Sequence, residues 1–287
     1  MLSYRTSVIA GKEGNMTNLI KKLKGRKIGR SALSVILAFA VLLSTVVIGS
    51  GIFASAASIW DGSSTAPSEG SGTESDPYLI TNGAELYNII ENGGGAGVYY
   101  KLTADIYLND IDKINWTTGE AIGGYSPKVW KVNNFNTAFQ GNIDGNGYTV
   151  YGLYYDCGTD STRWACWGNG LIPRVNHGTS VSVSKLGIDN MYIRGESGVS
   201  AFVGCAGTNA STSNRAQLTF DQCYVGENVT LKGNDVGVFR GVTRGSDLTV
   251  TNSYSLAAYT GTASRGFYGN YWECSVTIKN SYIHLAR

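Results

Sequence analysis

The chain has 287 residues, with 38 glycines, 18 tyrosines and four prolines, and charged residues make up 15% of it. The formal net charge of +2 hides an uneven distribution. Residues 1–56 carry eight basic residues and one acidic residue, whereas residues 57–287 carry 15 basic and 20 acidic residues. A mildly acidic body without a basic stripe argues against nucleic acid as a partner.

The N-terminal segment has the organisation of a secretory signal peptide. Basic residues at positions 21–30 precede an almost continuous apolar run from Ser31 to Phe53, and Ala54-Ser55-Ala56 follows. This order predicts a signal peptide over residues 1–56, cleavage after Ala56 and export through the Sec pathway. The run is also long enough to span a bilayer, so an uncleaved anchor is the alternative. No other membrane contact is predicted.

Composition divides the remainder of the chain. Residues 57–76 are rich in serine, glycine and threonine, which is typical of a flexible linker. Strand and turn signals continue from there, so residues 77–287 are assigned to one domain. Met16 directly precedes the basic residues. We therefore expect translation to start there, with residues 1–15 as a mis-called extension.

One short helix is predicted at the start of this domain. Between Gly83 and Glu91, apolar residues recur at helical spacing, with Thr81 or Asn82 available as the N-cap. No other helix is predicted in the exported part. From Val98 onward the pattern is one of short alternating strands broken by Gly, Asn, Asp and Ser, which indicates an all-β domain.

Internal repeats give the organisation of these strands. Four segments align at intervals of 37, 30 and 28 residues: Val181–Gly187, Leu218–Tyr224, Leu248–Tyr254 and Val276–Tyr282. A second motif recurs between them: Phe202-Val-Gly204, Phe239-Arg-Gly241 and Phe267-Tyr-Gly269. Repeats of this length with glycine-rich corners predict a β-solenoid, whose first turn the predicted helix would cap. An antiparallel sandwich is the competing architecture.

The stretch FQGNIDGNGYTVYGL, Phe139 to Leu153, places an Asp-Gly and an Asn-Gly between alternating apolar residues. It lacks the phosphate-loop lysine and a following helix, and it lacks the glutamate that a calcium-binding EF-hand requires. It is therefore predicted to be a tight structural turn between two strands.

Three segments together resemble the N-terminal part of GLUG-motif proteins. They are Asp76–Ile80, Tyr100–Leu108 and the glycine-rich stretch Phe139–Leu153. The resemblance implies an all-β, right-handed parallel β-helix in a secreted or surface-exposed bacterial protein, including adhesins. The chain departs from the family at its Gly-Leu-x-Gly repeat, where Val199-Ser-Ala-Phe202 stands instead. The resemblance supplies no catalytic residues.

Catalytic signals are sparse. There is no H-E-x-x-H or G-x-S-x-G motif, and the chain contains two histidines. A polysaccharide lyase or glycoside hydrolase is the alternative function, because the β-helix is a common fold for both. Asp105, Asp110 and Asp112 would then supply carboxylates. We interpret them instead as solvated turn residues. No catalytic residue, metal site or cofactor is predicted.

Aromatic residues favour binding. Five tryptophans in or beside loops are the predicted binding residues: Trp116, Trp130, Trp164, Trp167 and Trp272. Aromatic faces on a rigid β-scaffold stack on sugar rings or dock on proteins, although they also fill corners and cap ends. In Tyr99-Tyr100 and Tyr154-Tyr155, strand alternation must place one ring outside. The predicted function is a non-catalytic secreted or cell-surface module for adhesion, whose partner is an extracellular glycan or a surface protein.

Cysteines and chain length add two further expectations. The five cysteines, at positions 157, 166, 205, 223 and 274, include no C-x-x-C pair, which argues against a zinc ribbon or a thioredoxin-like motif. Cys157 and Cys166 either form a disulfide across a glycine-rich turn or act as small buried apolar residues. The fourth repeat copy reaches the end of the chain without a capping motif. This pattern predicts a piece of a longer surface protein.

Overall fold

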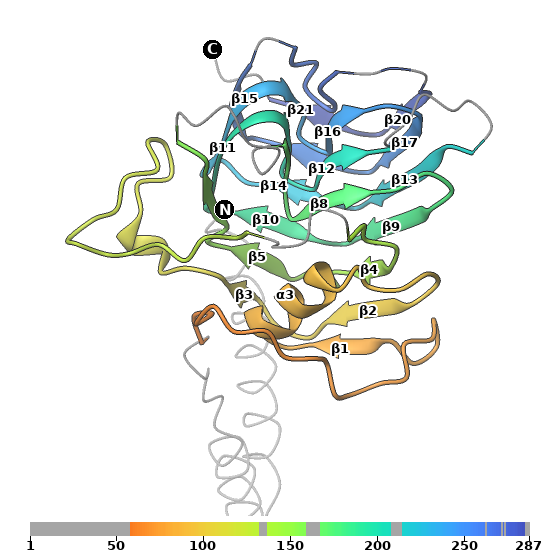
Figure 1. Ribbon diagram of the computed structural model, residues 1–287, viewed down its shortest axis with the longest axis horizontal. Coiled ribbons are helices and arrows are strands. Elements are labelled where there is room, and N and C mark those ends of the chain that lie inside the picture. The colour runs from red at the N-terminus through yellow and green to blue at the C-terminus, as the bar shows by residue number, and fades with distance from the viewer. Residues whose placement is uncertain are drawn as a thin grey trace, which may run out of the picture. The chain divides into compact units, whose positions relative to one another are not determined.

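A computed structural model describes residues 58–131, 137–158, 167–207, 214–261, 263–270, 272 and 274–284. These residues are mostly β-structure in parallel sheets, with one α-helix, α3 (Gly83–Glu91), and one 3-10 turn, η1 (Ile111–Lys113) (Figure 1). No helix in these ranges is long and apolar enough to cross a membrane. The predicted signal peptide lies outside the described residues.

The strands form four sheets. The first sheet contains, in spatial order, β1 (Tyr78–Ile80), β2 (Tyr99–Leu102), β4 (Asn142–Asp144), β9 (Ser180–Ser184), β13 (Ala216–Asp221), β17 (Ser246–Thr251) and β20 (Val276–Lys279). The second contains β3 (Ile106–Tyr107), β5 (Thr149–Tyr151), β10 (Gly187–Asp189), β14 (Tyr224–Val225), β18 (Tyr254–Ser255) and β21 (Tyr282–Ile283).

The other two sheets are shorter. The third sheet contains β6 (Tyr154–Asp156), β11 (Met191–Val199), β15 (Val229–Val236) and β19 (Ala258–Thr260), with β7 (Trp167–Asn169) also paired to β11. The fourth contains β8 (Ile172–Val175), β12 (Val203–Ala206) and β16 (Arg240–Thr243). Within each sheet the spatial order follows the sequence order. The chain therefore adds strands to the sheets in rotation, and the first sheet rises from orange to blue in Figure 1.

The predicted repeats lie directly over one another. Leu218 of β13 pairs in parallel with Val181 of β9 and with Leu248 of β17, and Leu248 pairs with Val276 of β20. All the pairings between these strands are parallel, so the antiparallel sandwich considered from the sequence is wrong. The aligned apolar residues point inward, because side chains alternate between the two faces of a strand. In β13, for example, Leu218 and Phe220 are buried whereas Thr219 is exposed.

Helix α3 forms where the apolar spacing predicted it. The side chain of Asn82 accepts hydrogen bonds from the backbone N–H groups of Ala84 and Glu85, both at 3.0 Å. The Glu85 carboxylate accepts from the backbone N–H of Thr81, the residue before the N-cap, at 2.7 Å. Leu86 and the other inward residues of the helix are buried in the same apolar core as the sheets.

Aromatic rings stack along the sheets inside and outside the core. Inside, Phe239 lies between Phe202 and Phe267, with ring centroids 5.3 and 5.8 Å apart and nearly parallel planes. These are the phenylalanines of the predicted Phe-x-Gly motif, so its regular phase reflects an internal stack. Outside, the repeated tyrosines Tyr254 and Tyr282 of the second sheet stack at 5.5 Å.

The glycine-rich stretch at 139–153 is a corner between two sheets. It connects β4 of the first sheet to β5 of the second. Asn146 and Gly147 have φ values of 54° and 87°, and the Asp144 carboxylate accepts the Asn146 backbone N–H at 2.9 Å. Only glycine, asparagine and a few other residues enter this left-handed region readily. The prediction of a structural turn is confirmed.

The segment predicted to be a flexible linker makes hydrogen bonds to the body, although most of its described residues are exposed. Trp60 is 5% exposed, and its backbone N–H donates to the Tyr107 carbonyl at 2.8 Å. Further along, the Leu79 N–H donates to the Glu69 carbonyl at 2.9 Å. Composition alone suggested flexibility. Backbone groups of this segment instead form hydrogen bonds with residues of the neighbouring strands, such as Tyr107 and Leu79.

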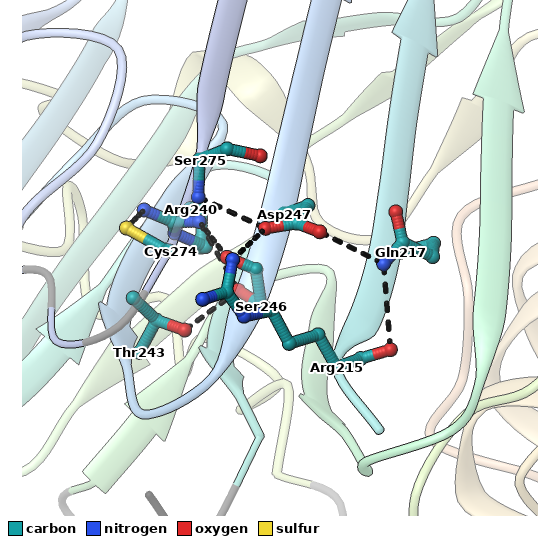
Figure 2. A network of polar contacts seen from close by, with 8 residues as sticks. All are labelled: Arg215, Gln217, Arg240, Thr243, Ser246, Asp247, Cys274 and Ser275. Carbon is teal, nitrogen blue, oxygen red and sulfur yellow. Dashed lines mark hydrogen bonds and ion pairs between the residues drawn. The ribbon is translucent and has the colours of Figure 1, made fainter. Parts of the chain in front are cut away.

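A polar network joins the last strands of the first sheet (Figure 2). The Asp247 carboxylate accepts hydrogen bonds from the Ser275 backbone N–H at 2.9 Å, from Gln217 Nε2 at 3.0 Å and from Arg215 Nη1 at 3.1 Å. Burial acts to raise the pKa of Asp247. The hydrogen bonds from Gln217, Ser275 and Arg215 outweigh it and lower that pKa from 3.8 to about 2.

This carboxylate predicts a specific acid sensitivity. Because its folded-state pKa is depressed, its stabilising effect is complete above the unfolded value and is lost as the pH falls toward about 2. Because the carboxylate is partly exposed, solvent screening reduces the effect of this shift on stability to about 1 kcal/mol. Urea unfolding of the protein and of Asp247→Asn, at about pH 5 and about pH 2.5, should show that the unaltered protein loses about 1 kcal/mol more than the variant. Equal losses would contradict the assignment.

Candidate binding groove on the first sheet

The outer face of the first sheet carries a groove of about 370 Å³ near its N-terminal strands. Its floor comes from β2, β4 and β9, which are neighbouring strands of the first sheet (Figure 1). Alternate residues of these strands point away from the core. One wall is the short segment that precedes β1. The lining residues are Glu74, Ser75, Pro77, Tyr99, Tyr100, Lys101, Asn142, Ile143, Asp144, Ser182 and Ser184.

Two residues that line the groove, Asn142 and Ser182, are hydrogen-bonded to each other. Asn142 Oδ1 accepts hydrogen bonds from Ser182 Oγ at 2.9 Å and from the Ser182 backbone N–H at 3.2 Å. These bonds assign the orientation of the Asn142 amide and restrict its rotation. Its Nδ2 group also lies 3.5 Å from the Val98 carbonyl, at the limit of a hydrogen bond. A polar group held in one orientation is suited to selective recognition of a ligand.

Charged and aromatic groups surround this pair. Tyr99 is in register with Asn142, and Lys101 is in register with Asp144 on the next strand. Asp144 already accepts the Asn146 backbone N–H, and Glu74 adds a second carboxylate at the wall. The groove therefore offers a partly exposed ring, donors and acceptors to one ligand. This combination suits a hydroxylated molecule such as a sugar.

The three aspartates considered for catalysis, Asp105, Asp110 and Asp112, do not line this groove. The Asp105 carboxylate accepts the Thr149 backbone N–H at 2.9 Å. Asp110 caps η1 by accepting the Asp112 backbone N–H at 3.1 Å. The described residues contain no group of three or more His, Cys, Asp or Glu side chains that could hold a metal ion.

Two of the five predicted binding tryptophans are core residues. Trp116 is 8% exposed and packs with Ile114 against Tyr192, and Trp130 is 3% exposed and packs with Trp60. Neither can present a ring face to a ligand, so their assignment to binding is wrong. Each indole N–H donates to a backbone carbonyl, at 2.9 Å for Trp116 and 3.1 Å for Trp130, which explains how these rings are accommodated inside.

The other three tryptophans differ from one another. Trp272 is 57% exposed and lies near the C-terminal strands, where the Arg244 guanidinium sits 5.9 Å from its ring centroid. Trp167 begins β7, a strand whose backbone is described. Trp164 lies outside the described residues, as does Cys166 of the cysteine pair considered above. The structure does not bring Trp272 to the groove.

The groove residues carry one signal that was visible in the sequence. Strand alternation requires one ring of Tyr99-Tyr100 to lie outside, and Tyr99 is that ring, whereas Tyr100 is 5% exposed. The groove residues beside Tyr99 come from strands that follow it by 43 residues (Asn142) and 83 residues (Ser182). Only the register of β2, β4 and β9 shows that Asn142 and Ser182 stand beside it.

Comparison with known proteins gives two similarities. The chain is 33% identical over 151 residues to halomucin from Haloquadratum walsbyi, a match that covers 52% of this chain and 1% of the relative. A crystal structure of a candidate immunoglobulin A1 protease from Bacteroides ovatus aligns over 75% of this chain and 77% of its own, with 14% identity and a TM-score of 0.38. No family model matches the chain.

Proposed function

We propose that residues 77–287 form a right-handed parallel β-helix. Support comes from the four parallel sheets, each of which adds its strands in sequence order. Right-handed crossovers are the rule for parallel strands joined within one sheet. In this proposal α3 caps the first turn, where it packs its apolar residues into the common core. Membership of the GLUG-motif proteins belongs to the same proposal.

In this architecture, the groove on the first sheet binds an extracellular glycan, and the module serves adhesion without catalysis. The observation that carries this function is the juxtaposition of the Tyr99 ring with the oriented Asn142–Ser182 pair. Sugar recognition uses an apolar ring face for the C–H groups and oriented polar groups for the hydroxyls. Lys101 and Asp144 add charge that would select among sugars.

The secretory pattern of residues 1–56 supports an extracellular place for this module. The similarity to halomucin is in keeping with a place at the cell surface, although the chain spans 1% of that relative. A surface protein is the second candidate partner. It would meet the same polar face, which continues beyond the groove through Thr219, Thr249 and Thr277.

A glycan array on the purified protein tests this function, scored for both binding and turnover in buffer with calcium. Tyr99→Ala removes the ring from the groove and is expected to weaken glycan binding at least about tenfold, or about 1.4 kcal/mol. Trp272→Ala removes an exposed ring outside the groove and serves as the matched control, with binding unchanged. If Trp272→Ala abolishes binding and Tyr99→Ala does not, the groove is not the site.

One observation favours the alternative, a polysaccharide lyase or hydrolase. Lys101 stands in register with Asp144 in the groove, and Glu74 lies at its wall. A basic group and carboxylates are the residue types that such enzymes require. Turnover of an acidic polysaccharide that disappears in Lys101→Met would overturn the non-catalytic proposal. Binding without turnover in both proteins would support it.

A further inference from the structure

A second pocket lies at the N-terminal end of the first sheet, where α3 packs. It has a volume of about 230 Å³. Three parts of the chain form it: the segment before β1, the last turn of α3 with the residues that follow it, and strands β1 and β2. The lining residues are Ala66, Pro67, Tyr78, Asn88, Ile89, Asn92, Gly94 and Tyr100.

The strands contribute two tyrosine rings from their inner face, whereas the groove described above uses their outer face. Tyr100 is 5% exposed, so its side chain lies on the buried face of β2. Tyr78 is in register with Tyr100, and the two rings stack with their centroids 6.0 Å apart. The Tyr100 hydroxyl donates a hydrogen bond to the Gly94 carbonyl. Together with Ile89 and Pro67, these rings give the pocket an apolar wall.

The segment before β1 is held in place on both sides of the residues that line the pocket. The Thr65 backbone N–H donates to the Ala84 carbonyl of α3 at 3.2 Å, and the Glu69 carbonyl accepts the Leu79 backbone N–H at 2.9 Å. Pro67, between these bonds, has a fixed φ angle. The pocket is therefore preformed, which lowers the conformational entropy that binding would cost.

Two side-chain amides supply hydrogen-bond acceptors. Asn88 Nδ2 donates to Ser64 Oγ at 3.0 Å, and Asn92 Nδ2 donates to the Asn88 backbone carbonyl at 3.0 Å. These bonds assign the orientation of both amides. Neither Oδ1 atom accepts a hydrogen bond from a described residue, so each remains available as an acceptor at the pocket.

The charge of the pocket differs from that of the groove. Among the described residues, none that lines the pocket carries a charge, whereas Glu74, Lys101 and Asp144 line the groove. The pocket also lies at the C-terminal end of α3, where backbone carbonyls carry partial negative charge and no basic residue occupies the last turn. This end repels anions, and a cation would lose its hydration without gaining a carboxylate. A neutral ligand that donates hydrogen bonds fits best.

We propose that this pocket binds the N-acetylhexosamine unit of a glycan. Its volume is below the range of about 300–1,000 Å³ typical of sites for drug-sized molecules, so it accommodates one small unit. An N-acetylated sugar is neutral and combines N–H and O–H donors with an apolar methyl group. The acetamido N–H donates to an oxygen of Asn88 or Asn92, and the methyl group packs on the apolar wall. The choice of a glycan rests on the proposed function, but the site is separate from the groove.

Titration of the full-length chain with four monosaccharides tests the chemistry of the pocket. Saturation-transfer NMR would compare N-acetylglucosamine and N-acetylgalactosamine with glucose and glucosamine. At least one N-acetylated sugar is expected to bind with a Kd of about 1 mM, with its acetamido methyl receiving the strongest saturation. Glucose and glucosamine should bind at least about tenfold more weakly, because they lack the acetamido group. Equal or tighter binding of either, or no binding of both N-acetylated sugars, would overturn the proposal.

Variants then locate the bound sugar. Asn92→Ala removes one acceptor and should weaken binding of the N-acetylated sugar about threefold to tenfold. Asn228→Ala removes an exposed asparagine outside both the pocket and the groove, and it should leave binding unchanged. If Tyr99→Ala abolishes binding and Asn92→Ala does not, the sugar occupies the groove, which overturns this proposal and leaves the proposed function intact. If Asn92→Ala does not fold, the comparison of the four sugars on the unaltered chain decides.

Discussion

Replacing Phe239 by alanine is expected to lower the free energy of unfolding by about 3–5 kcal/mol. Phe239 is fully buried, and it is the middle ring of the internal stack, so its removal leaves a cavity between Phe202 and Phe267. The rings above and below cannot close this gap, because the parallel strands that carry them keep their spacing. Urea unfolding followed by circular dichroism would measure the loss.

Tyr282→Ala is the matched control for this change. Tyr282 belongs to an aromatic stack as well, with its ring centroid 5.5 Å from that of Tyr254, but the residue is 57% exposed. Removing the Tyr282 ring should lower the free energy of unfolding by less than about 1 kcal/mol, because this ring buries little apolar surface in the folded protein. Equal losses in the two variants would show that the stability of the fold does not depend on the internal stack.

Gly241→Ala is expected to destabilise the fold by about 3 kcal/mol or more, although it adds a single methyl group. A Cβ atom at this position would lie 2.5 Å from the Gly198 carbonyl carbon and 2.5 Å from the Gly204 carbonyl oxygen. Both obstacles are backbone atoms of the neighbouring turn, which a side-chain rotation cannot remove. The strands would have to separate, which would weaken the parallel ladder of the fourth sheet.

Gly147→Ala controls for the general effect of removing a glycine. Gly147 has a φ value of 87°, but a Cβ atom there would meet nothing within 4 Å. Gly147→Ala is therefore expected to lower the free energy of unfolding by about 1–2 kcal/mol, which is the strain of placing alanine in the left-handed backbone region. The urea midpoints of the two variants should differ clearly. A Gly241→Ala midpoint at or above that of Gly147→Ala would contradict the close backbone approach.

The arrangement of the strands could be predicted from the sequence because the repeats carry it. Leu218, Leu248 and Val276 were aligned by sequence, and these residues pair in the first sheet. The Phe-x-Gly motif was likewise found in the sequence, and its phenylalanines stack on one another from turn to turn. The same residue types recur in each turn because each turn packs against equivalent residues of the turns before and after it. A pattern that repeats along the sequence therefore predicts which distant residues are in contact.

The positions of the tryptophans could not be predicted in this way. Trp116 and Trp130 lie between strands in sequences that look like exposed loops. Their burial depends on Tyr192 and Trp60, which are distant in sequence and follow no repeat. The hydrogen bonds of residues 58–76 could not be predicted for the same reason, because the segment bonds to residues that its own composition does not reveal.

The groove and Arg240 show a further limit of sequence reasoning. Asn142 and Ser182 are unremarkable polar residues until the register of their strands brings them together. Arg240 stands in the Phe-Arg-Gly copy of a recognised motif, where composition favours an exposed arginine. Strand alternation and the pairing of Arg240 with Val203 place its side chain in the core instead.

The register of the first sheet also constrains how the chain can change in length during evolution. Leu218 and Leu248 are separated by 30 residues and Leu248 and Val276 by 28, yet all three occupy one column. Insertions and deletions between strands are thus absorbed at the corners. A single residue gained inside β17 would instead turn its buried face outward. Sequences that descend from this one should therefore vary in whole turns or corner lengths, while strand lengths stay constant.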